Sequence, residues 1–185
     1  MARNLAGKTI LLGVTGSIAA FKAVGLTSKL VQEEATVVVL MTASAAKFVA
    51  PLSFEAITRG PVVSSLWAPG YSGMVESRHI SLAEKAHLLL IAPATANVIA
   101  KLANGLCDDI LTCTALATRA PILIAPAMND NMYSHPATQR NVALLRERGC
   151  LFVGPKEGRL AGGKVGLGRL ADIPDIMAAV REAIK

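Results

Sequence analysis

A turn rich in glycine and hydroxyl groups near the N-terminus has the composition of an anion-binding site. Gly13, Thr15, Gly16 and Ser17 lie at and just beyond the end of an apolar stretch. If that stretch is a strand and a helix follows it, free backbone N–H groups and the helix dipole favour a phosphate there. The sequence has neither the third glycine of a dinucleotide turn nor the lysine of a P-loop, which favours a mononucleotide. A tight strand-to-helix turn without a ligand would explain the same residues.

Polar residues follow three further apolar stretches in the same way. Thr42 and Ser44 follow the second stretch, Thr95 and Asn97 the third, and the block from Pro126 to Tyr133 the fourth. The carboxyl ends of parallel strands meet at one edge of a sheet, which is where such sheets bind ligands. Hydroxyl and amide groups at that edge can hydrogen-bond the polar rim of a flat ring. Thr95 is explained equally well as a helix cap.

These candidate residues require strands and helices that alternate along the chain. The strand-like stretches are apolar, and stretches with helical periodicity separate them, which is typical of an α/β fold. Expected strands cover residues 9–14, 36–41, 88–91, 122–125 and 151–153, with a brief one after residue 61. Expected helices cover residues 17–33, 44–50, 52–58, 95–104, 108–118, 136–148 and 174–185. We predict a single domain over residues 1–185, doubly wound and Rossmann- or flavodoxin-like, with a mostly parallel sheet and helices on both faces.

Two connections are expected to be irregular. Residues 64–77 are rich in glycine, proline and serine, and predict a mobile loop or an interface. Residues 154–170 predict a glycine-rich loop. Ser134 is expected to cap the helix over residues 136–148, and Gly149 to end it.

The composition excludes intrinsic disorder and a membrane span. Of 185 residues, 52% are hydrophobic and 17% charged, so folding can bury enough apolar surface to offset chain entropy. The apolar stretches are too short to cross a bilayer, and residues 9–14 are too short for a signal peptide. Cys107, Cys113 and Cys150 are odd in number and lack a metal-type spacing. We therefore expect reduced thiols, a cytoplasmic protein and no metal site.

The net charge of +6 is concentrated in one segment. Residues 140–170 contain seven basic and two acidic residues, whereas the rest of the chain is nearly balanced. Such a segment predicts an anionic partner. Nucleic acid is disfavoured because Phe152 is the segment's sole aromatic residue and no nucleic-acid-binding motif is present. A small phosphorylated or carboxylated ligand suits the segment better.

Three motifs of the sequence resemble one protein family. They are GSIAA at 16–20, APATANVIAKLANGLCDD at 92–109 and PAMNDNMY at 126–133. The chain is similar in these motifs, and over nearly its whole length, to the homo-oligomeric flavin-containing cysteine decarboxylases. Within that family it looks most like the phosphopantothenoylcysteine decarboxylases of coenzyme A biosynthesis. Flavin prenyltransferases share the fold, but the PAMN-type motif argues against them.

The resemblance implies bound FMN, with its phosphate near the first motif. The residues that would bind FMN are Gly16, Ser17, Thr42, Ser44, Ala94, Thr95, Asn97 and Ala127. Family members assemble as trimers, often as dodecamers, with the flavin at a subunit boundary. In bacteria the family's decarboxylase is commonly fused ahead of a phosphopantothenate–cysteine ligase. This chain is therefore expected to be either free-standing or the front part of such a protein.

The resemblance also assigns the catalytic and substrate-binding residues. His79 matches the family's active-site histidine, although a histidine at the end of a loop is by default a surface or capping residue. An imidazole can accept and return a proton near neutral pH. Asn129 would bind the substrate carboxylate, and Met132, Lys164 and Arg169 would also contact a phosphorylated substrate. His87 is expected to be structural, and His135 to lie in the first turn of a helix.

The chemistry implied is the decarboxylation of 4′-phospho-N-pantothenoylcysteine to 4′-phosphopantetheine. The flavin oxidises the cysteine moiety, CO₂ leaves to give an enethiolate, and the flavin returns the hydride. Many family members carry a cysteine that protonates the enethiolate, but Gly162 occupies the matching position here. Either another proton donor replaces that cysteine, or the reaction stops at an enethiol. The alternatives are thus oxidative decarboxylation of a peptide's C-terminal cysteine, or a non-catalytic flavin-binding regulatory subunit.

Overall fold

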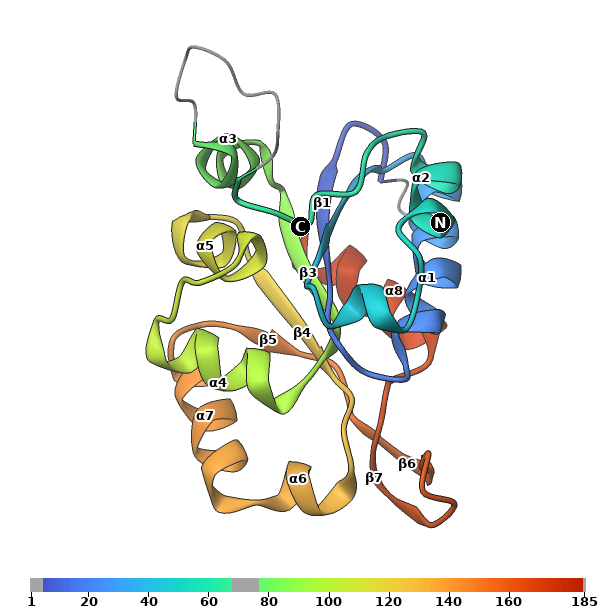
Figure 1. Cartoon of the computed structure of the whole chain (residues 1–185), viewed down its shortest axis with the longest axis vertical. Helices are drawn as coiled ribbons and strands as arrows, with labels where there is room; N and C mark the ends of the chain where they lie inside the picture. The colour runs from blue at the N-terminus through green and yellow to red at the C-terminus, as the bar shows by residue number, and fades with distance from the viewer. Residues whose placement is uncertain (1–4, 68–76, 185) are drawn as a thin grey trace.

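A parallel β-sheet forms the centre of the molecule. The computed structural model describes residues 5–67 and 77–184, and within them the main sheet has five strands in the order β2-β1-β3-β4-β5 (Figure 1). All neighbouring strands in it are parallel. The strands are β1 (Thr9–Val14), β2 (Thr36–Met41), β3 (Leu88–Ala94), β4 (Ile122–Pro126) and β5 (Leu151–Phe152). The predicted fold class is confirmed.

Helices cover both faces of this sheet (Figure 1). One face carries α1 (Ala20–Gln32) and α8 (Ile173–Ala183), with α2 (Leu52–Thr58) packed beside α1. The helices of the other face are α4 (Ala96–Asn104), α5 (Ile110–Ala117) and α7 (Pro136–Glu147), with α3 (Arg78–Lys85) packed against α5. The remaining helical turns are a 3₁₀ turn over Ala45–Lys47 and the short α6 (Asp130–Ser134).

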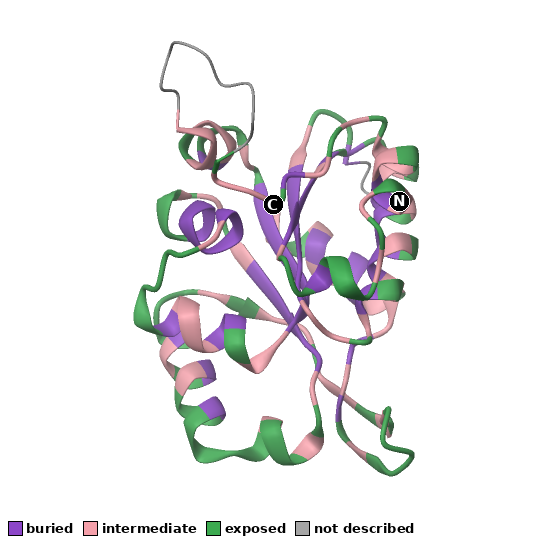
Figure 2. Cartoon of the chain, in the orientation of Figure 1, coloured by how far each residue is buried: buried purple, intermediate pink, exposed green. Residues whose placement is uncertain are grey.

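Each face of the sheet has its own apolar core. Leu12 and Leu90 belong to the core under α1 and α8, whereas Leu11, Leu89 and Ile124 belong to the core under α4 and α5. Successive side chains of a strand point to opposite faces, so a strand covered on both sides must be apolar throughout. Figure 2 shows the consequence, a buried sheet between helices whose outer sides are exposed.

Several predicted boundaries differ from the structure. The first helix begins at Ala20 rather than at residue 17, because the chain first makes a turn in which Ala20 N–H donates to the Ser17 carbonyl oxygen. The helix α7 is capped by His135, whose Nδ1 accepts from Ala137 N–H at 3.2 Å, and not by Ser134. Gly149, at φ 88°, ends that helix as predicted.

The prediction of an irregular loop over residues 154–170 is wrong. Two short strands, β6 (Lys156–Arg159) and β7 (Val165–Arg169), pair there as an antiparallel hairpin. Its glycines conceal it in the sequence because glycine has a low strand propensity. Residues 68–76 of the other predicted loop lie outside the described residues, and Val63 forms the brief bridge to Leu40.

The hairpin packs closely against α6 because glycines face it. Met128 N–H donates to the Gly168 carbonyl oxygen at 3.0 Å, and a Cβ on Gly168 would lie 2.2 Å from the Met128 carbonyl oxygen. A Cβ on Gly166 would lie 2.9 Å from a carboxylate oxygen of Asp130. Lys164 Nζ completes the contact at 2.9 Å from Asp130, and this ammonium lowers the pKa of that carboxyl.

The prediction that the cysteines are reduced is wrong for two of the three. Cys107 and Cys113 form a disulfide with their Cα atoms 4.6 Å apart. Gly105, in the left-handed conformation, ends α4 and turns the chain so that Cys107 comes beside the first turn of α5. Cys150 is a free, half-buried thiol whose pKa is raised by burial.

Among the described residues, the structure has no helix that is long and apolar enough to span a membrane.

Candidate active site

A cavity of about 1080 Å³ opens at the carboxyl edge of the sheet. Its walls come from the segments that follow β1, β2, β3 and β4, and from the β6–β7 hairpin. The chain leaves β1 toward one face of the sheet and β3 toward the other, so the two connections diverge and leave a crevice. In parallel sheets such a reversal of strand order marks the ligand-binding position.

The Thr15 hydroxyl ties the two diverging connections together. It is fully buried, donates to the Pro93 carbonyl oxygen at 2.6 Å and accepts from Thr95 N–H at 3.1 Å. These bonds join the turn after β1 to the turn after β3, across about 80 positions of the sequence. One side chain therefore holds the two turns together at the base of the cavity.

The turn over residues 16–19 forms one end of the cavity. A Cβ on Gly16 would lie 2.5 Å from the Ser44 Cβ, so the absence of a side chain lets the turns after β1 and β2 meet. The Ser17 hydroxyl accepts from Ala19 N–H at 3.3 Å, just before α1 begins. With 13 residues in α1 behind it, this turn presents the positive end of a helix dipole, as a phosphate site requires.

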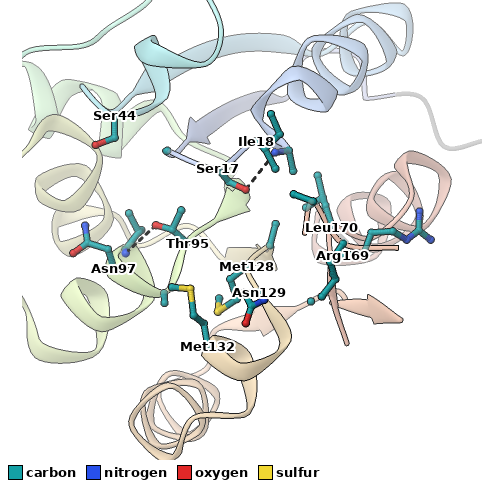
Figure 3. A pocket seen from close by; sticks show the side chains of 18 of the residues that line it. Ser17, Ile18, Ser44, Thr95, Asn97, Met128, Asn129, Met132, Arg169 and Leu170 are labelled. Carbon is teal, nitrogen blue, oxygen red and sulfur yellow. Dashed lines mark hydrogen bonds between the residues drawn. The ribbon is translucent and has the colours of Figure 1, made fainter. Parts of the chain in front are cut away.

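Side chains from α4 and α6 line the opposite side of the cavity (Figure 3). Thr95 caps α4, with its hydroxyl accepting from Val98 N–H at 3.3 Å. The Asn129 carbonyl oxygen Oδ1 accepts from Asn131 N–H at 2.9 Å and thereby caps α6. The side-chain NH₂ of Asn129 is left as a donor at the cavity, and this group can hydrogen-bond a carboxylate.

Most of the predicted site residues line this one cavity. They are Gly16, Ser17, Thr42, Ser44, Thr95, Asn97, Ala127, Asn129, Met132 and Arg169. Ala94 does not line it, but its carbonyl oxygen accepts from Ala127 N–H at 3.0 Å and so joins β3 to the turn after β4. Lys164 lies outside the lining and pairs with Asp130.

His79 is not part of this cavity within one chain. It lies half-buried in the first turn of α3, which precedes the amino end of β3, whereas the cavity lies at the carboxyl end. Figure 1 shows α3 at the top of the molecule and α6 with the hairpin at the bottom. The catalytic role of His79 stays a prediction. His87 is structural, as predicted, because its Nδ1 accepts from Thr9 N–H at 3.0 Å.

Carboxylates neutralise two of the four basic residues that line the cavity. Lys101 Nζ lies 2.7 Å from Asp108 and 3.4 Å from Asp109, and the hydrogen bond to Asp108 raises the pKa of Lys101. Arg169 lies 2.8 Å from Asp172 and lowers the pKa of that carboxyl. The charge count over residues 140–170 missed the Arg169–Asp172 pair because Asp172 lies outside that segment.

Phe21 and Lys22, from the first turn of α1, line the cavity but were not among the residues predicted to bind a ligand. Arg159, at the end of β6, also lines the cavity and belongs to the basic segment that was predicted to face an anionic ligand. A signal for Phe21 and Lys22 was present, since they directly follow the phosphate-type turn. The sequence could not show that Arg159, unlike Arg169, has no carboxylate partner.

The Flavoprotein family model matches residues 1–185 of this chain. The coenzyme A biosynthesis bifunctional protein CoaBC of Bacillus subtilis is 50% identical over 173 residues, which are 94% of this chain and 42% of that protein. The chain thus spans less than half the length of this relative. A probable phosphopantothenoylcysteine decarboxylase of Streptococcus mutans is 43% identical, and the match covers 96% of this chain and 99% of that protein.

Solved structures resemble the whole fold. The crystal structure of the FMN-dependent cysteine decarboxylase SpaF superposes with a TM-score of 0.83 at 38% identity, covering 98% of this chain and 99% of SpaF. A PPC decarboxylase variant in complex with pantothenoylaminoethenethiol superposes with a TM-score of 0.82 at 34% identity, covering 95% of this chain and 97% of that one.

Replacing Thr15 by valine should weaken the cavity and the fold together. Thr15→Val keeps the side-chain volume but leaves the Pro93 carbonyl oxygen and the Thr95 N–H without this partner. We expect the free energy of unfolding to fall by about 1–3 kcal/mol, measured by urea denaturation. Thr15→Ser retains the hydroxyl, so its free energy of unfolding should fall clearly less than that of Thr15→Val. Equal stability of the valine variant and the unmodified protein would show that the Thr15 hydrogen bonds do not stabilise the fold.

Proposed function

The chain belongs to the Flavoprotein family, and from this premise we propose that it is an FMN-dependent phosphopantothenoylcysteine decarboxylase. The observation that carries the proposal is the cavity at the strand reversal, which combines a phosphate-type turn with the Asn129 amide. The names of the relatives from Bacillus subtilis and Streptococcus mutans support the coenzyme A pathway. The cytoplasmic location predicted from the sequence stays a prediction.

The residues at the cavity fit FMN. The turn at Gly16 and Ser17 offers backbone N–H groups for the phosphate, and the hydroxyls and amide of Thr42, Thr95 and Asn97 suit the polar edge of a flat ring. When bound, FMN supplies a reversible hydride acceptor for the cysteine moiety of the substrate. The chain's own residues then have to position the substrate and transfer protons.

Asn129 is placed to orient the substrate carboxylate. Its carbonyl oxygen is engaged at the start of α6, so the side chain cannot rotate freely and its NH₂ group keeps one direction. A carboxylate held by this amide would lie among Met128 and Met132. Such apolar surroundings favour loss of the charge as CO₂, because they disfavour an ionised carboxylate.

We propose that a second copy of the chain brings its His79 to this cavity. The cavity rim exposes Ile18 and Phe21, at 58% and 60% of their surface, and the α3–α5 side exposes Ile80 and Leu116. When two different apolar surfaces of one chain bind each other head to tail, the contacts close into a ring if the rotation between copies allows it. A ring contact of this kind is consistent with the trimer, or dodecamer of trimers, that the resemblance implies.

A second candidate activity rests on Gly162. This residue lines the cavity, and the space where a Cβ would lie has no neighbour within 4 Å among the described residues. The side chain at this position therefore offers no proton for the enethiolate. An enzyme that releases an enethiol, as expected of a peptide cysteine decarboxylase, is the alternative.

A fused or separate phosphopantothenate–cysteine ligase is the proposed partner for the coenzyme A activity, as the bifunctional relatives suggest.

The direct test is incubation of the flavin-loaded protein with 4′-phosphopantothenoylcysteine, followed by mass analysis. We expect release of CO₂ and formation of 4′-phosphopantetheine. His79→Asn should slow this reaction at least 100-fold, because proton transfer by a positioned histidine contributes about 10²–10⁴-fold. A product two mass units lighter would favour the second candidate. Absence of turnover in the unmodified protein would refute the proposed function.

Mixing two inactive variants tests whether subunits share the site. His79→Asn and Asn129→Ala should each be inactive alone. If His79 serves the cavity of another copy, co-expressed variants form some sites that have both native residues, and CO₂ release returns. If each chain uses its own His79, no mixed site is native, and the mixture stays as inactive as its components.

A further inference from the structure

The cavity contains two cations that the protein itself does not neutralise. Its basic lining residues are Lys22, Lys101, Arg159 and Arg169. Carboxylates pair with Lys101 and Arg169. Within residues 5–67 and 77–184, neither Lys22 nor Arg159 has an ion-paired or hydrogen-bonded side-chain partner. The cavity therefore presents two free positive charges to a ligand.

The two free cations lie on different elements. Lys22 is in the first turn of α1, directly after the turn at Gly16 and Ser17 that suits the flavin phosphate. Arg159 ends β6, next to Leu160 and Ala161 at the tip of the hairpin, which also line the cavity. FMN has one phosphate, and Lys22 is the cation placed beside the site expected for it. Arg159 remains for a second anion.

Unlike Arg159, the neighbouring cations Lys156 and Arg169 have carboxylate partners. The Arg169 side chain lies over Gly158, where a Cβ would be 2.8 Å from the Arg169 Nε, and its guanidinium reaches Asp172. Lys156 Nζ lies 3.3 Å from Asp172 and also pairs with Asp175, both at α8. Of the two hairpin arginines that line the cavity, Arg159 is therefore the one without a carboxylate partner in the described part of the chain.

The tip that carries Arg159 is held in place. Leu160 N–H donates to the Lys164 carbonyl oxygen at 2.8 Å, and Gly163 N–H donates to the Leu160 carbonyl oxygen at 2.9 Å. The Lys164–Asp130 ion pair and the Met128–Gly168 backbone bond fix the hairpin to the α6 side of the cavity. Arg159 is thus a cavity-lining cation on a hairpin that is fixed to the α6 side of the cavity.

We propose that Arg159 binds the terminal phosphate of the substrate and sets the preference for phosphorylated over unphosphorylated substrates. The proposal rests on the proposed function, which supplies a substrate with a phosphate monoester at one end and a carboxylate at the other. The planar guanidinium offers paired N–H donors that match phosphate oxygens. Asn129 holds the carboxylate end, so the two residues together set the direction in which the substrate lies.

The kinetic test compares 4′-phosphopantothenoylcysteine with its dephosphorylated form. Arg159→Ala should lower kcat/KM for the phosphorylated substrate about 10- to 100-fold, mainly through KM, and leave the unphosphorylated substrate unchanged. Lys156→Ala is the matched control, because it removes a cation of the same strand that α8 already neutralises. Equal flavin content in all variants, read from absorbance, would show that Arg159 does not act on FMN binding.

A binding measurement keeps the proposal testable if the protein proves inactive. Calorimetry should show that the flavin-loaded protein binds 4′-phosphopantothenate more tightly than pantothenate, and that Arg159→Ala abolishes this difference. That result in a protein without decarboxylase activity would refute the proposed function but support Arg159. An unchanged phosphate preference in Arg159→Ala, or equal losses for both ligands, would refute the assignment while leaving the decarboxylase function intact.

Discussion

The buried Thr15 hydroxyl is the interaction on which the rest of the site depends. The strand order places β1 beside β3, and their connections leave toward opposite faces of the sheet. The sheet hydrogen bonds end there, so the two turns would be free to separate. The Thr15 hydroxyl donates to the Pro93 carbonyl oxygen and accepts from the Thr95 N–H, and so closes the base of the crevice. The turn at Gly16 and the start of α4 at Thr95 then form one rigid wall.

The other wall depends on close backbone contact rather than on apolar packing. The hairpin lies so close to the turn before α6 that any side chain at Gly168 would clash with the Met128 carbonyl oxygen. Its lysine neutralises Asp130, the residue directly after Asn129. The residues that hold the hairpin are therefore next to the residue proposed to orient the substrate carboxylate. This arrangement leaves Arg159 as the free cation on that side of the cavity.

The sequence predicts the sheet well and the second wall poorly. Continuous apolar strands such as Leu88–Ala94 and terminal hydroxyls such as Thr95 identify the parallel sheet and its binding edge, because burial on both faces dictates their composition. The hairpin could not be predicted, since its strands contain Gly158, Gly166 and Gly168. These glycines are needed because other side chains and backbone pack closely against them in the folded chain. The cysteine pair and the ion pairs at Asp172 and Asp130 likewise depend on tertiary contacts, which cannot be predicted from the number of charged residues or cysteines.

This crevice is suited above all to a flavin phosphate. The most direct measurement is a titration of the flavin-free protein with FMN and with riboflavin, followed by flavin absorbance and fluorescence. We expect one FMN per chain, with riboflavin bound at least tenfold more weakly, because charge-assisted hydrogen bonds to the phosphate contribute about 1.5–3 kcal/mol. Equal affinity for the two flavins, or no flavin binding, would show that the crevice is not a flavin phosphate site.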